Sequence, residues 1–154
     1  MLEKLRRFSA LGQPAQMLFL RGLLLLSAVS LSLKLRGFQA TRATLQKVLS
    51  ASAPQPHSDA VSQCVTLTAR MVNAADRHGL VHPSCLAKSL TLWWLLGHQG
   101  ITSSLRIGIR KENEKLQAHA WVEREGVALN EPEEHHRHYA AFDTSLASFA
   151  DDQR

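Results

Sequence analysis

The sequence has few cysteines: Cys64 and Cys85 are the only two among its 154 residues. Two cysteines cannot form a disulfide framework, and without a CxxC pair the sequence has no zinc-ribbon or thioredoxin-like redox motif. We therefore expect a reducing, cytoplasmic location. The length suffices for one ordinary domain, so a single functional site is expected.

Acidic residues are scarce near the N-terminus, where eight basic residues among the first 47 accompany a single acid, Glu3. The whole chain has a formal net charge of +5, which would suit nucleic acid, anionic lipid or an acidic peptide. Aromatic residues make up 6% of the chain, and they do not interleave with basic residues as on a base-stacking surface. We expect an acidic peptide or a partner protein, and no nucleic acid.

A long uninterrupted apolar run is also missing. The apolar stretch from Gly22 to Leu33 lies between Arg21 and Lys34 and is shorter than the roughly 18 to 20 residues that cross a bilayer. No small-residue cleavage site follows it, so a signal peptide is not indicated. We expect a buried helix, with weak association with a membrane surface as the alternative.

The remaining patterns predict helices first and strands later. Residues 15–36 are expected to form a helix that ends at Gly37, and 41–49 a second one. Prolines and small polar residues mark 51–58 as a linker between an N-terminal helical segment, 1–50, and a core, 59–154, which together make one compact unit.

The core should begin with a helix from Ser58 or Asp59 to Gly79, in which Cys64 is interpreted as a small apolar core residue. A second core helix is expected to begin at Cys85, because Pro83 disfavours helical geometry at the preceding residue and Ser84 is a good N-cap. Alternating apolar and polar residues then predict three antiparallel strands, at 105–109, 117–123 and 127–129, with a tight turn at Glu125-Gly126.

The predicted position of Cys85 has chemical consequences. A thiol reacts as its thiolate, which the dipole and the free N–H groups of a helix N-terminus stabilise. The same N–H groups could stabilise an oxyanion on an attacked carbonyl group. A structural cysteine at a helix start is the alternative interpretation.

A general base is also present in the pattern. His119 lies between alanines on the second predicted strand, where it could approach the start of a packed helix, although a structural histidine is the alternative. A base needs a group that holds its ring. Asn130 or Glu131, at the end of the next strand, could receive the ring N–H.

Together, CLAKSLTLWWLLGHQGITSSLRIGIR, AHAWVE and VALNE resemble the transglutaminase-like leader peptidases of lasso-peptide biosynthesis, the B proteins. The resemblance is strong over residues 80–143 and looser over the N-terminal helices. It implies a papain/transglutaminase-like α+β fold, in which N-terminal helices and a nucleophile-bearing helix pack on a small antiparallel sheet.

The resemblance assigns Cys85 as nucleophile, His119 as base and Glu131 as orienting acid. The family usually has Asp at the last position, so Glu131 is a departure and Asn130 stays an alternative. The implied activity is a cysteine peptidase, without cofactor, that removes the leader from a ribosomally made precursor before a separate cyclase forms the macrolactam. Acyl transfer to an amine and a non-catalytic scaffold that binds a peptide or the cyclase are the alternatives.

No separate leader-recognition domain is evident, so the chain is expected to be the standalone peptidase of a split pair. Its implied partners are the precursor peptide, a leader-recognition (RRE) protein and the lasso cyclase. His135, His136 and His138 are too close in sequence to converge on one ion, and no metal site is expected.

Overall fold

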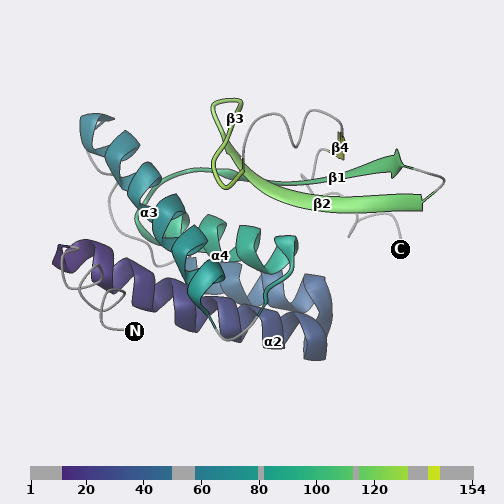
Figure 1. Cartoon of the computed structure of the whole chain (residues 1–154), viewed down its shortest axis with the longest axis horizontal. Coiled ribbons are helices and arrows are strands. Elements are labelled where there is room, and N and C mark those ends of the chain that lie inside the picture. The colour runs from purple at the N-terminus through teal and green to yellow at the C-terminus, as the bar shows by residue number, and fades with distance from the viewer. Residues whose placement is uncertain (1–11, 50–57, 80–81, 113–114, 132–138, 143–154) are drawn as a thin grey trace.

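The computed structural model describes residues 12–49, 58–79, 82–112, 115–131 and 139–142. They form three helices and a four-stranded antiparallel sheet of order β3-β2-β1-β4, which confirms the α+β class. In Figure 1 the sheet lies along one side of the molecule and helix α2 along the other, with α4 between them. The elements are α2 (Gln13–Leu49), α3 (Ser58–His78), α4 (Cys85–His98), β1 (Ser104–Glu112), β2 (Lys115–Arg124), β3 (Val127–Ala128) and β4 (Ala140–Phe142).

Helix α2 consists of two helical halves that meet at Gly37. This residue has φ 76° and ψ 179°, a left-handed φ that favours glycine because it has no Cβ. The hydroxyls of Ser32 and Thr41 are 2.8 Å apart across the junction, and Thr41 also donates to the Gly37 carbonyl. The predicted boundary at Gly37 is confirmed, although the second half begins directly after it rather than at Thr41.

Helix α4 is the centre of the fold. Its side chains Leu92, Leu95 and Leu96 pack with Val72 of α3 and Val122 of β2 in one core cluster. Ala87 and Leu90 form a second cluster with Val29 of α2. Because α4 contacts both other helices and the sheet, it holds the residues at its N-terminus in a defined position relative to β2.

The sheet is built on the hairpin of β1 and β2. The turn after β2 has positive φ at Glu125 and Gly126, as a two-residue hairpin turn requires, so this predicted turn is confirmed. Strand β3 ends at Ala128, one residue earlier than expected, and β4 was not predicted as a strand. It pairs with β1 through the register Ile109↔Ala140.

The apolar N-terminal helix is buried on one face only. Gly22, Leu26 and Val29 are buried, whereas Leu24 and Leu31 are exposed. The expectation of a buried helix therefore holds for one face only, and 22% of the most apolar 18-residue window is buried. The predicted linker lies outside the described residues, except for Ser58, where α3 begins.

Candidate active site

Cys85 lies at the first position of α4. The preceding residue, Ser84, has extended backbone angles and is the N-cap, and its Oγ accepts a hydrogen bond from the Ala87 N–H at 3.2 Å. Its carbonyl accepts the Lys88 N–H at 3.0 Å. The amides of Cys85 and Leu86 have no partner within the helix, because no turn precedes them.

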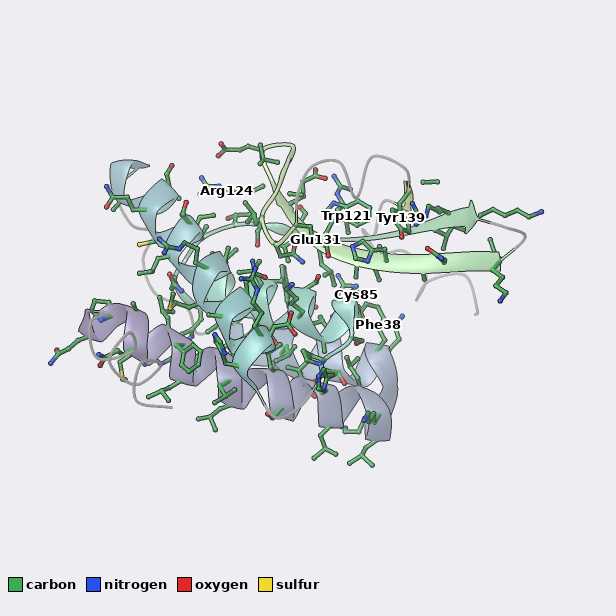
Figure 2. The ribbon with its side chains drawn as sticks, in the orientation of Figure 1. Phe38, Cys85, Trp121, Arg124, Glu131 and Tyr139 are labelled. Atoms are coloured by element: carbon green, nitrogen blue, oxygen red, sulfur yellow. The ribbon has the colours of Figure 1, made fainter. Side chains whose placement is uncertain are left out.

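The thiol of Cys85 is free and half-buried. Figure 2 shows this residue at the end of α4 nearest the sheet. The helix start predicted from Pro83 and Ser84 is therefore confirmed, and it places a cysteine beside backbone donors. The first turn contains no acidic residue that would oppose a thiolate.

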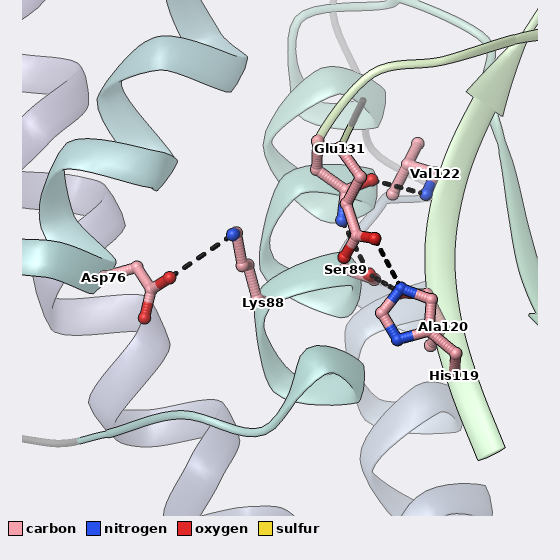
Figure 3. A network of polar contacts seen from close by, with 8 residues as sticks. Asp76, Lys88, Ser89, His119, Ala120, Val122 and Glu131 are labelled. Carbon is pink, nitrogen blue, oxygen red and sulfur yellow. Dashed lines mark hydrogen bonds and ion pairs between the residues drawn. The ribbon is translucent and has the colours of Figure 1, made fainter. Parts of the chain in front are cut away.

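His119, on β2, is in direct contact with Glu131. Its Nε2 lies 2.6 Å from the Glu131 Oε2, and the two side chains are 18% and 13% exposed. Because Glu131 occupies Nε2, the Nδ1 atom remains for another partner. Figure 3 shows this second ring nitrogen on the side of the first turn of α4.

The packing of α4 on β2 fixes where the start of α4 lies along the strand. Ser89 donates its hydroxyl hydrogen to the Ala120 carbonyl at 2.8 Å. Leu92 and Leu96, one and two turns further along α4, lie in one core cluster with Val122. The helix and the strand therefore run in the same direction. Cys85 lies one turn before Ser89 on the same helical face. We therefore infer that it lies beside the part of β2 that precedes Ala120, which contains Ala118 and His119.

Asn130 has a different set of partners from Glu131. It is 4% exposed, its Oδ1 accepts the Val122 N–H at 2.8 Å, and its Nδ2 donates to the Ser89 Oγ at 3.1 Å. This amide thus joins the segment after β3 to β2 and α4. The side chain in contact with His119 Nε2 is that of the neighbouring residue, Glu131.

An aromatic wall covers the imidazole. The ring of Tyr139 is tilted against His119 at 5.1 Å between centroids, and that of Trp121 is stacked at 6.2 Å. Gly108, opposite His119 in the sheet, permits this packing, since a Cβ there would lie 2.9 Å from the Tyr139 Cβ and 3.0 Å from the Trp121 ring. The sequence did not indicate the contact between Tyr139 and His119.

A cleft of about 550 Å³ opens beside the imidazole, between α3, α4 and the segment after β3. Two cations line it: Arg77 is exposed, and the Lys88 Nζ lies 3.3 Å from Asp76, as Figure 3 shows. Its lining residues are Asn73, Arg77, Lys88, His119, Leu129, Asn130 and Glu131.

Three further features of the described residues were candidates for a second site: a metal cluster, the second cysteine and a second hollow. No cluster of three metal-binding side chains is found among the described residues, while His135, His136 and His138 lie outside them. Cys64 is half-buried on α3 and packs against the main core cluster. A second hollow, of about 450 Å³, lies near Ile101, Arg106 and Glu123, and neither Cys85 nor His119 lines it.

A cysteine at a helix N-terminus and a strand histidine in contact with a carboxylate are the components of a papain-like nucleophilic site. The sequence model of a family described as the transglutaminase-like superfamily matches residues 23–144. The chain belongs to the transglutaminase-like superfamily. This superfamily includes cysteine peptidases and acyltransferases, and the match covers Cys85, His119 and Glu131. No curated protein and no solved structure gave a significant match.

Proposed function

We propose that this transglutaminase-like protein is a cysteine peptidase that removes the leader from a lasso-peptide precursor. The observation that carries the catalytic part is the 2.6 Å contact between His119 Nε2 and Glu131 Oε2, with Nδ1 left for a proton from the thiol. The choice of a lasso precursor as substrate rests on the resemblance of the AHAWVE and VALNE segments to B proteins.

In the proposed reaction His119 takes the thiol proton of Cys85, and the Sγ thiolate attacks the carbonyl carbon of the scissile peptide bond. The oxyanion that forms would accept hydrogen bonds from the amides at the start of α4. The C–N bond then breaks as His119 gives its proton to the departing amine, the new N-terminus of the core peptide. The leader stays attached to Cys85 as a thioester.

Water completes the cycle. His119 takes a proton from a water molecule that attacks the thioester carbonyl, the C–S bond breaks, and the leader leaves with a free carboxylate. Glu131 would hold the imidazole in the tautomer with hydrogen on Nε2 and stabilise the imidazolium that forms in each half-reaction.

The cleft supports a substrate with an acidic side chain near the scissile bond. Arg77 has an exposed side chain on α3, and Lys88 of α4 lines the same cleft. An exposed cation such as Arg77 would attract and align a peptide carboxylate. In the proposed pathway a separate leader-recognition protein supplies further binding energy, a separate cyclase uses the freed core, and all three proteins work in the cytoplasm.

The proposal is tested with purified protein, a synthetic precursor and the recognition protein, followed by mass analysis of both products. Hydrolysis predicts a leader that ends in a free carboxylate. A leader joined to an added amine would indicate acyl transfer instead. Specific precursor binding without cleavage, with the recognition protein present, would support the scaffold alternative and contradict the proposal.

A further inference from the structure

An apolar stripe runs along the outer face of α2 from Met17 to Leu35. Its members are separated by three, four or seven residues, so they share one face of the helix. Leu24 and Leu35 are 72% and 75% exposed, which is unusual for side chains of this type. The apolar stripe consists of Met17, Leu20, Leu24, Leu31 and Leu35.

The stripe extends over about 27 Å of helix axis, at 1.5 Å per residue. In Figure 1 it belongs to the helix on the far side of the molecule from the sheet, and side chains project outward from that helix in Figure 2. A contiguous apolar surface of this kind marks an interaction site. Occupation of this surface would leave the β1–β2 hairpin uncovered.

The length and composition of α2 would allow it to cross a bilayer, but its packing argues against a spanning position. The inner face places Gly22 against Ala75 of α3, where an added Cβ would lie 3.5 Å from that side chain. Leu26 and Val29 on this face are 3% and 2% exposed. Spanning would strip these contacts, whereas lying flat on a membrane would preserve them.

The charge of α2 indicates what covers the stripe. The helix contains five basic residues and no acidic one, and none of the five makes an ion pair within the described part of the chain. Arg21 and Lys34, both exposed, border the stripe on either side. Two copies of this face would bring like charges together, whereas an anionic surface complements them.

We propose that the outer face of α2 docks the protein on an anionic membrane surface. The apolar stripe would enter the boundary between headgroups and acyl chains, as in interfacial helices, while the bordering cations contact lipid phosphates. A position flat on the membrane keeps α3, α4 and the sheet folded above it.

The test is sedimentation of the full chain with vesicles of phosphatidylcholine, with and without phosphatidylglycerol. Wild-type protein should pellet with the anionic vesicles, and added salt should release much of it. The double variant Leu24→Glu, Leu31→Glu should lose at least about tenfold in partitioning. Leu116→Glu is the matched control, because Leu116 is 73% exposed but lies on β2, and it should bind like wild type.

The charge variant Arg21→Gln, Lys34→Gln gives a second, independent test, because it leaves the stripe intact. It should reduce binding to anionic vesicles and leave binding to phosphatidylcholine vesicles unchanged. Circular dichroism verifies that each variant is folded. Wild-type protein that stays in the supernatant with anionic vesicles would overturn the proposal. So would a wild-type dimer that the glutamate variant dissociates, because the stripe would then be covered by a second copy.

Discussion

The neighbours Asn130 and Glu131 offer a way to separate structure from chemistry. The Asn130 amide is buried and accepts the Val122 N–H, so Asn130→Ala leaves that donor without a partner. An orphaned buried group costs about 1 to 3 kcal/mol. At roughly 2 to 4 °C per kcal/mol for a protein of this size, a cost in the middle of that range, about 2 kcal/mol, should lower Tm by about 4 to 8 °C.

Glu131→Gln should lower activity and leave stability nearly unchanged. The side chain keeps its size, but the charge that stabilises the imidazolium is lost. We expect kcat/KM to fall by at least about tenfold, equivalent to about 1.4 kcal/mol of transition-state stabilisation, with a Tm within about 2 °C of wild type.

Both variants are assayed for precursor cleavage at a temperature well below the lower Tm, with calorimetry in parallel. The activity of the Asn130 variant, measured on folded protein, should stay within about threefold of wild type. If Asn130→Ala costs more activity than Glu131→Gln, the assignment of Glu131 as orienting acid is refuted. If neither variant affects activity, another group holds the imidazole.

Three further predictions concern packing, substrate and partner. Gly108→Ala should lower Tm by several degrees in a thermal melt and reduce cleavage activity, because its Cβ would collide with Tyr139 and Trp121. Gly12→Ala is the control, since its Cβ would have its nearest contact at 3.7 Å, and it should change neither Tm nor activity. Arg77→Glu should raise KM about fivefold for a precursor with an acidic residue beside the scissile bond. Arg70→Glu is the control, because Arg70 is exposed on the same helix but lies outside the cleft, and it should leave KM unchanged. Equal changes in KM for the two variants would show that the cleft does not bind the substrate. Adding the leader-recognition protein should raise kcat/KM, because leader contacts outside the reacting bond are then supplied in trans; unchanged kinetics would contradict the split architecture.

Local sequence signals sufficed for the elements that carry the site. Ser84 indicated the start of α4, alternating residues indicated β1 and β2, and Glu125-Gly126 indicated the turn between β2 and β3. Each of these signals depends on residues within one turn or hairpin, so no knowledge of distant contacts is needed. The pairing of β4 with β1 joins segments about 30 residues apart, and three residues are too few for a periodic pattern.

The residue pattern left Asn130 and Glu131 open, and only the family resemblance favoured Glu131. Both lie just after β3, and the packing of that segment against Ser89 and Val122 decides which side chain turns toward the imidazole. The sequence also could not predict which face of α2 stays exposed. An apolar helix can bury any face, and the contacts of Gly22, Leu26 and Val29 determine which face remains uncovered.

In the proposed reaction Cys85 carries the leader as a thioester. Intact-mass analysis of acid-quenched reactions of protein, precursor and recognition protein, followed by peptide mapping, detects this thioester directly. We expect a mass increase equal to the leader acyl group on the peptide that contains Cys85, with Cys64 unmodified, and no adduct or cleavage in folded Cys85→Ala. Cleavage by Cys85→Ala within about tenfold of the wild-type rate would contradict the proposed reaction.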